Sequence, residues 1–292
     1  MLIIKIPASN ATTIRAPPAM VHSRTHHLKD QRSSGTRGYI VKLPNLILSN
    51  DIIQVYQKQL GQWDNLNHLI VCRKTKKACI VDPFDGSFWE DFCQDNNFQI
   101  DQVWLTHSHW DHIKGVEALV NSTVFSPVVR CHELEQQRGY NAEYVQWWRH
   151  NEHSFETCVI GELEFSVHCT PGHTPGHVVF IGNGIVISGD CLFLRSCGRT
   201  DLLGGDEGKQ RLSLKYLQTI FTHIAGTNLV VPGHQYQLQD GTTPTVMELS
   251  KVINSNEALM AIEDDDKWAS LPFLSFDDDL AAKARQQEAQ QS

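Results

Sequence analysis

The string THSHWDH at residues 106–112 places three histidines and one aspartate within a few positions of each other. It directly follows an apolar run that is typical of a β-strand. On an extended strand end, the side chains of His107 and His109 point to the same side, because strand side chains alternate. A turn into a helix would then bring Asp111 and His112 toward a neighbouring position. Imidazoles and carboxylates at this spacing suit zinc, or iron or manganese where carboxylates take part.

Three further strings each place a candidate ligand at the end of an apolar run, namely CTPGH, VISGD and VVPGH, which end at His173, Asp190 and His234. In each string a glycine precedes the ligand and lets the backbone turn tightly beside a metal. One such string alone is more typical of a turn. Together, the four strings supply five histidines and two aspartates. That set is enough for two metals with one bridging carboxylate, an arrangement used for hydrolysis.

The elements that must position these residues are short runs rich in Ile and Val, separated by Asn, Asp, Gly and Lys. One set of predicted strands lies within 46–105 and a second within 156–188, followed by a strand at 229–231. Helices are predicted at 86–97 and 208–221. Strands in groups with a few helices between them predict an α/β fold, with two packed mixed sheets flanked by helices.

Composition excludes several classes of function. The 292 residues are 41% hydrophobic and 20% charged, which is typical of a globular protein. The net charge of −8 argues against general nucleic-acid binding. No window approaches 18 consecutive apolar residues, so we expect no membrane-spanning helix and no membrane partner. The 8 cysteines include no CxxC pair, which indicates reduced, buried thiols and a reducing compartment such as the cytoplasm.

In their order along the chain, the strings resemble the motifs of the metallo-β-lactamase superfamily, and within it the glyoxalase II-like (hydroxyacylglutathione hydrolase-like) branch. The resemblance covers about residues 45–240 and rests on THSHWDH, TPGHTPGH, SGDCLF, CGRTD and GHQY. It implies an αβ/βα sandwich with a metal centre at one edge, between the sheets. It also implies two ligand sets and a bridging residue: His107, His109 and His173 for one metal, Asp111, His112 and His234 for the other, and Asp190 between them.

Composition, charge and the resemblance together predict three segments. Residues 1–36 are expected to form a disordered extension, 43–240 the metallo-β-lactamase-like domain, and 241–292 a short helical segment with an acidic tail. Residues 1–50 carry seven basic residues and one acid. Such a start resembles an organelle transit peptide, so mitochondrial targeting is an alternative to the cytoplasm.

Two divalent metal ions are the implied cofactors, with zinc preferred and iron or manganese as alternatives. Metal coordination lowers the pKa of bound water from 15.7 to about 7, so a bridging hydroxide would be a nucleophile at neutral pH. Asp111 and Asp190 are the expected catalytic carboxylates. A thiol with a pKa near 8.5 leaves as thiolate without strong acid help. We therefore expect a binuclear thioester hydrolase acting on a small-molecule thioester, with glutathione thioesters as one candidate.

Individual residues favour this branch to different degrees. Trp110 and His177 resemble thioester-hydrolase members, and His177 is expected to support the ligands rather than to bind metal. Arg199 and Tyr236 are the expected substrate contacts, and Tyr236 matches the family's glutathione-contacting tyrosine. An ion pair of Arg199 with Asp201 or Asp206 is an equally good interpretation. The segment after His234 is shorter than the helical domain of full-length glyoxalase II, so the hydrolase chemistry is better supported than a glutathione substrate.

Two other functions are kept as alternatives. A persulfide dioxygenase would use a single iron held by His107, His173 and Asp190. A non-hydrolytic metal-binding protein is the second, and the complete set of seven ligands argues against it. The aromatic residues of 140–148 stand at helical spacing and are expected to pack in the core, with a substrate wall as the alternative. The sequence gives no indication of the oligomeric state.

Overall fold

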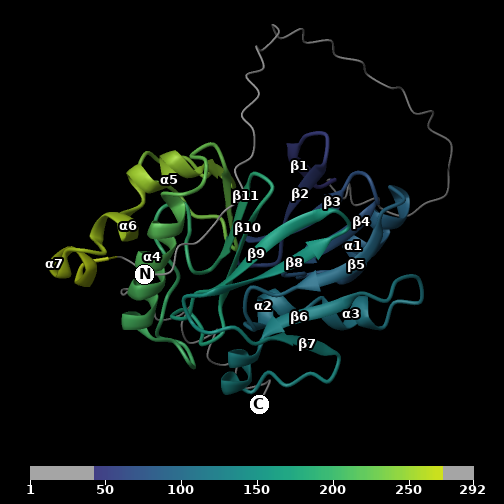
Figure 1. Ribbon diagram of the computed structural model, residues 1–292, viewed down its shortest axis with the longest axis horizontal. Helices are drawn as coiled ribbons and strands as arrows, with labels where there is room; N and C mark the ends of the chain where they lie inside the picture. Colours follow the sequence, from purple (N-terminus) through teal and green to yellow (C-terminus); the bar gives the residue numbers. More distant parts are fainter. Residues whose placement is uncertain (1–42, 272–292) are drawn as a thin grey trace, which may run out of the picture. The chain divides into compact units, whose positions relative to one another are not determined.

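A computed structural model describes residues 43–271. Over that range the chain forms two mixed β-sheets flanked by helices, as predicted (Figure 1). The predicted extension and the acidic tail beyond residue 271 lie outside the described residues, and the three segment boundaries stay predictions. No helix within 43–271 is long and apolar enough to cross a membrane.

The first sheet contains seven strands that lie in sequence order. Its first four strands pair antiparallel and its last four pair parallel, with the fourth strand common to both groups. The strands are β1 Asn45–Ser49, β2 Ile53–Leu60, β3 Asn65–Cys72, β4 Lys77–Val81, β5 Gln99–Trp104, β6 Val128–His132 and β7 Val145–Trp148. Every residue of β3 is buried, because this strand has neighbours on both edges and packing on both faces.

The second sheet has the strand order β13-β12-β11-β10-β9-β8. Its strands pair antiparallel, except that β11 and β12 run parallel. Their bounds are β8 Phe155–Ile160, β9 Leu163–Cys169, β10 Val178–Gly182, β11 Ile185–Gly189, β12 Leu229–Pro232 and β13 Met247–Glu248. The parallel pair matters for the site, because the carboxyl ends of two adjacent parallel strands meet at the same edge of a sheet.

Helices connect the strands and cover both sheets. They are α1 Gly86–Asp95, α2 Trp110–Ile113, α3 Val116–Val120, the 3₁₀ helix η1 Glu133–Arg138, α4 Glu207–Phe221, α5 Leu249–Ser255, α6 Glu257–Ala261 and α7 Asp265–Ala269. The two longest begin at aspartates whose side chains accept a backbone N–H of the first turn, Asp85 from Phe88 and Asp206 from Lys209. Such caps satisfy backbone donors that have no partner within the helix.

Three apolar layers hold the fold together. The central layer joins the facing sides of the two sheets, an outer layer packs α1 and α3 on the first sheet, and another packs α4 to α7 on the second. Consecutive residues of β3 alternate between layers, with Ile70 in the central layer and Leu69 and Val71 in the outer one. This alternation follows from the two-residue period of a strand.

Two expectations about side chains were tested by the fold. All eight cysteines lie within the described residues as free, buried thiols, as expected. The interpretation of residues 140–148 as helical is wrong, because residues 145–148 form strand β7. The expected core packing holds for Trp148, which is 2% exposed and packs between the sheets. Parallel pairing with β6 decides the conformation of this segment over its local pattern.

Candidate metal centre

The seven predicted ligands come together at one edge of the two sheets. His107, His109 and the helix α2 that carries Asp111 and His112 follow β5 of the first sheet. The loop between β9 and β10 contributes His173, and the parallel strands β11 and β12 end directly before Asp190 and near His234. All seven side chains are buried, so the site is a closed cluster of polar groups rather than a surface patch.

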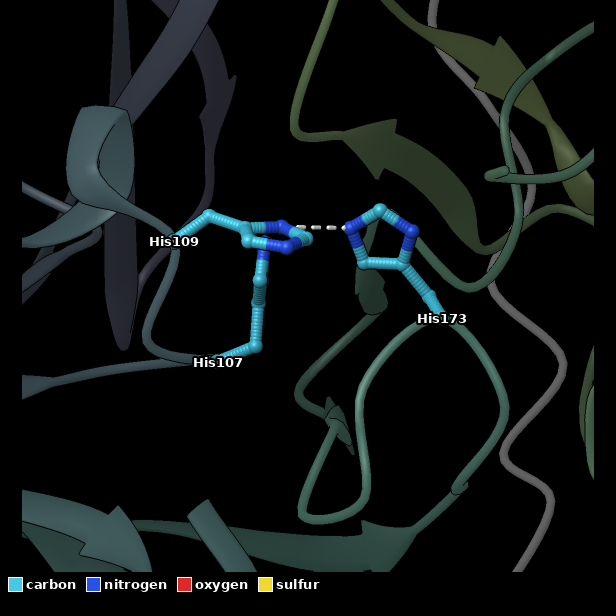
Figure 2. Close-up of side chains that lie close together, drawn as sticks. All are labelled: His107, His109 and His173. Carbon is cyan, nitrogen blue, oxygen red and sulfur yellow. Dashed lines mark hydrogen bonds between the residues drawn. The ribbon is translucent and has the colours of Figure 1, made fainter. Parts of the chain in front are cut away.

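The first triad consists of His107, His109 and His173 (Figure 2). Their candidate ligand atoms lie within 4.8 Å of one another. Nδ1 of His109 lies 2.9 Å from Nε2 of His173. Two nitrogens bound to one tetrahedral zinc ion at 2.0–2.1 Å would lie about 3.3 Å apart, so this spacing requires little movement to accept the ion.

The second triad consists of Asp111, His112 and His234, whose candidate ligand atoms also lie within 4.8 Å of one another. Oδ2 of Asp111 lies 3.5 Å from Nε2 of His112 and 3.3 Å from Nε2 of His234. The two imidazole nitrogens lie 3.2 Å apart. These three distances match the separation of ligand atoms around a single tetrahedral ion.

Asp190 lies between the two triads. Its Oδ2 is 3.5 Å from Nε2 of His173 in the first triad and 3.3 Å from Nε2 of His234 in the second. Oδ1 of the same carboxylate lies 3.6 Å from Nε2 of His112. One carboxylate therefore faces both groups of ligands, which is the position that a bridging residue requires.

The buried polar atoms of the site fit divalent cations. Nε2 of His107 and Oδ1 of Asp190 are buried and have no hydrogen-bond partner among residues 43–271. A buried polar atom without a partner costs about 1–3 kcal/mol, and a bound cation would remove that cost. A Cβ atom at Gly233 would lie 2.2 Å from Oδ1 of Asp190, so the backbone approaches the carboxylate more closely than other residues allow. The residues present therefore fit a metal centre.

Hydrogen bonds behind the imidazoles fix which nitrogen faces the centre. Nδ1 of His112 lies 3.0 Å from a carboxylate oxygen of Asp82. Nδ1 of His173 donates to the Arg199 carbonyl at 2.6 Å, and Nδ1 of His234 donates to the Trp63 carbonyl at 2.7 Å. Histidine ligands of metals characteristically donate their second nitrogen in this way, which leaves Nε2 as the ligand atom.

Comparison with known proteins agrees with this geometry. Residues 64–234 match the sequence model of the metallo-β-lactamase superfamily. The chain belongs to the metallo-β-lactamase superfamily. This superfamily consists mostly of hydrolytic metalloenzymes, and the histidine and aspartate clusters of the chain are candidate sites for divalent metals.

Solved structures of the metallo-β-lactamase fold resemble the chain. ETHE1 from Myxococcus xanthus is 24% identical with a TM-score of 0.58, and the match covers 75% of this chain and 92% of that one. A metallo-β-lactamase from Staphylococcus aureus subsp. aureus COL is 22% identical with a TM-score of 0.61, over 75% and 66%. The BLEG-1 B3 metallo-β-lactamase is 26% identical with a TM-score of 0.55, over 70% and 99%. These likenesses support the fold, and the glyoxalase II-like branch stays a prediction.

Two residues at the metallo-β-lactamase site were not predicted from the sequence. Asp82 follows β4 and accepts from the backbone N–H of Thr106 at 2.7 Å and from its hydroxyl at 2.6 Å, besides contacting His112. Asp82 also forms a third group of possible ligands with His107 and His112. Because it contacts Nδ1 of His112, away from His234, it is better explained as an orienting residue. Asn65 donates to Oδ2 of Asp111 at 2.6 Å and so holds that carboxylate in place.

The electrostatics of the two triads differ. Burial lowers the pKa of His107, His109 and His173, so these imidazoles are neutral and ready to act as ligands. Burial also lowers the pKa of His112, but the carboxylates of Asp111 and Asp190 outweigh it and raise that pKa to about 9. Burial lowers the pKa of His234 too, but Asp190 and Asp111 outweigh it and raise that pKa well above its usual value. The second triad therefore balances its carboxylates with positively charged imidazoles, and a bound cation would replace that positive charge.

The predicted substrate contacts, Arg199 and Tyr236, both have partners within the structure. The Arg199 guanidinium makes two bonds of 2.5 Å to the carboxylate of Asp201, which is one of the two ion pairs considered from the sequence. Tyr236 is 43% exposed, and its ring centroid lies 4.7 Å from that of Phe193 and 6.3 Å from that of His234. Trp110 packs edge-on against the rings of Trp63 and Phe84. Substrate binding by Arg199 and Tyr236 stays a prediction.

Proposed function

We propose that the protein is a hydrolase that uses two divalent metal ions and cleaves small-molecule thioesters. The observation that carries the proposal is the position of Asp190, whose Oδ2 lies 3.5 Å from His173 and 3.3 Å from His234. A carboxylate shared by two complete triads supports a centre with two ions rather than one. The membership of a mostly hydrolytic superfamily supports the reaction class.

The residues of the site have distinct roles in this proposal. The first triad would hold one ion, the second triad the other, and Asp190 would contact both. When bound, the two ions would lower the pKa of a shared water to about 7 and polarise the substrate carbonyl. Oδ1 of Asp190 has no hydrogen-bond partner among the described residues, so it would be available to a bound cation. Asn65 orients Asp111 through a hydrogen bond, and Asp82 orients His112 in the same way.

The thioester substrate is supported by the chemistry of the leaving group. A thiol with a pKa near 8.5 departs as thiolate at neutral pH, so a site of metal ligands needs no additional strong acid. The resemblance of Trp110 and His177 to thioester hydrolases favours the same class. The packing of Trp110 against Trp63 and Phe84, with centroid distances of 5.9 and 5.8 Å, places an aromatic cluster beside helix α2.

The persulfide dioxygenase alternative requires only His107, His173 and Asp190 around one iron. It gives no role to Asp111, His112 and His234, although their ligand atoms lie 3.2–3.5 Å apart. The intact second triad therefore favours the hydrolase over the dioxygenase.

The test combines metal analysis with two assays on one preparation of the purified protein. One assay follows thiol release from S-lactoylglutathione and from simple acyl thioesters, and the other follows oxygen uptake with glutathione persulfide. We expect near two metals per chain and thiol release. One iron per chain with oxygen uptake and no thiol release would overturn the proposal in favour of the dioxygenase.

A further inference from the structure

A buried glutamate joins the two loops that carry the first triad. Glu135 lies in η1 and is 0% exposed, although no ligand string contains it. Its Oε2 accepts hydrogen bonds from the backbone N–H of Ser108, at 2.8 Å, and from the Ser108 hydroxyl. Its Oε1 accepts the backbone N–H of Gly176 at 2.8 Å. Burying a carboxylate costs free energy unless it is hydrogen-bonded, and here three donors supply those bonds.

The donors to Glu135 stand beside ligands of the first triad in the chain. Ser108 stands between His107 and His109, after a strand of the first sheet. Gly176 stands three residues after His173, in a loop of the second sheet. The first triad is thus assembled from both sheets, and one carboxylate binds a backbone N–H beside the ligands from each sheet.

The packing around Glu135 is tight on the side of the second sheet. A Cβ atom at Gly176 would lie 2.7 Å from the backbone nitrogen of Glu135 and 3.0 Å from its Cγ. Only a glycine therefore lets the 173–177 loop approach η1 closely enough for the hydrogen bond to form.

Arg138 completes the network from the next turn of η1. Its Nη1 lies 3.0 Å from the Ser108 hydroxyl oxygen and 3.9 Å from Oε2 of Glu135, and its Nε donates to the Leu203 carbonyl at 2.7 Å. The side chain of Arg138 is 4% exposed, so it supplies a buried counter-charge to the glutamate. Its positive charge also helps burial to lower the pKa of His109 and His173, which keeps these imidazoles neutral.

We propose that Glu135 is a positioning residue for the metal held by His107, His109 and His173, which it serves by fixing the two ligand loops relative to each other. The inference rests on the metal centre of the proposed function but not on its substrate. The Ser108 and Gly176 groups that donate to Glu135 stand beside ligands of the first triad and none belongs to the second, so we expect the effect on the ion of the first triad.

The substitution Glu135→Gln tests this role with minimal change of shape. A glutamine amide has one oxygen and one NH₂ group, so one of the two backbone N–H groups would face a donor instead of an acceptor. One ligand loop would lose its contact while the side chain keeps its volume. Glu133→Gln is the matched control, because Glu133 lies in the same helix but contacts Arg149 at the surface, at 3.2 Å.

The experiment measures zinc affinity by competition with a chelator, in two backgrounds that each leave one triad complete. In His234→Ala, where the first triad is the complete one, Glu135→Gln should weaken zinc binding by about 10- to 100-fold. In His107→Ala, where the second triad is complete, Glu135→Gln should leave zinc affinity unchanged. Glu133→Gln should have no effect in either background.

An equal loss of affinity in both backgrounds, or no loss in either, would overturn the inference, because a general structural role would not distinguish the triads. If Glu135→Gln does not fold, Ser108→Ala replaces it. That variant keeps the carboxylate but loses the Ser108 hydroxyl, which donates to Glu135 and accepts from Arg138. We therefore expect a loss of about 2- to 10-fold confined to the His234→Ala background. Zinc uptake by the unsubstituted chain separates this inference from the proposed function. If that chain binds two ions and Glu135→Gln has no effect, only this inference is refuted. If that chain binds no zinc, the proposed function is refuted as well.

Discussion

His177 accepts the backbone N–H of Asp190 on its Nε2, at 3.0 Å, and the N–H of Cys191 on the same nitrogen, at 3.2 Å. Its Nδ1 lies 3.0 Å from the Thr170 hydroxyl oxygen. Both nitrogens are therefore occupied by protein groups, and His177 does not face the metal centre. A Cβ atom at Gly189 would lie 2.7 Å from Nε2 of His177, so the turn before Asp190 packs directly on this imidazole. His177 thus holds the backbone that carries Asp190, the carboxylate proposed to bridge the two ions.

The substitution His177→Ala should both destabilise the protein and impair the metal centre. It leaves the buried N–H of Asp190 without an acceptor, which costs about 1–3 kcal/mol in the free energy of unfolding, while the N–H of Cys191 keeps the Ser188 carbonyl as an acceptor. Urea unfolding in the presence of a chelator measures that loss, and metal analysis measures the ions retained. His223→Ala, at an exposed histidine, is the control. An unchanged midpoint and full metal content in His177→Ala would contradict this assignment.

One ligand substitution in each triad separates the two proposed chemistries. His107→Ala and His234→Ala should each lower the metal content toward one ion per chain and abolish thiol release, because each removes a ligand of a different ion. A dioxygenase that needs only His107, His173 and Asp190 would instead keep its oxygen uptake in His234→Ala. Thioester hydrolysis retained in both variants would refute the two-metal assignment.

The candidate ligands could be found in the sequence because each stands in a short string at the end of an apolar strand. Asp82 follows β4 as Asp190 follows β11, but it has no second ligand nearby, and a lone aspartate after a strand is more typical of a turn. Glu135 could not be predicted, because its partners lie 27 and 41 residues away along the chain and belong to different sheets. A buried carboxylate also departs from the usual exposure of charged residues.

The helices and strands also differ in whether the local sequence or a distant partner determines them. The helix predicted at 208–221 and observed at 207–221 has its own capping aspartate and apolar face, so the local sequence specifies it. Strand β7 is short, and its conformation depends on pairing with β6. Aromatic residues at helical spacing could not reveal that pairing, since the partner strand lies more than ten residues away.

Arg199 offers a test of substrate class that does not disturb the metal ligands. Arg199→Ala keeps the backbone carbonyl that binds His173 and removes only the guanidinium. If Arg199 binds an anionic thiol carrier, KM should rise about tenfold or more for glutathione thioesters, given the strength of hydrogen bonds to charged groups, and stay constant for uncharged thioesters. Steady-state kinetics with the two substrate classes measure this difference.

Asp201→Ala is the matched variant for that experiment. It removes the partner of the ion pair and leaves the guanidinium of Arg199 in place. If the ion pair alone matters, Arg199→Ala and Asp201→Ala should change the kinetics equally for both substrate classes, and the substrate-binding role of Arg199 would be refuted.

The stability of the fold should fall in acid because of a histidine outside the metal centre. His68 on β3 is fully buried, and burial lowers its pKa to about 3. Its Nε2 lies 3.1 Å from the Gln57 amide nitrogen, which donates to the neutral imidazole. Above pH 6.5, His68 is neutral in the folded and unfolded states alike. Below that pH the unfolded chain binds a proton that the folded protein does not, so the free energy of unfolding decreases by about 1.4 kcal/mol per pH unit down to about pH 3.

The variant His68→Met removes this titration and isolates the contribution of His68. Urea unfolding of both proteins at pH 7, 6 and 5 should show a stability of the variant that falls less steeply with acid, although its stability at pH 7 is lower because Gln57 loses an acceptor. Every other titrating group is common to the two proteins and cancels in the difference of their slopes. Parallel slopes between pH 7 and 5 would show that His68 accepts a proton in the folded state, and that the buried environment of β3 does not hold it neutral.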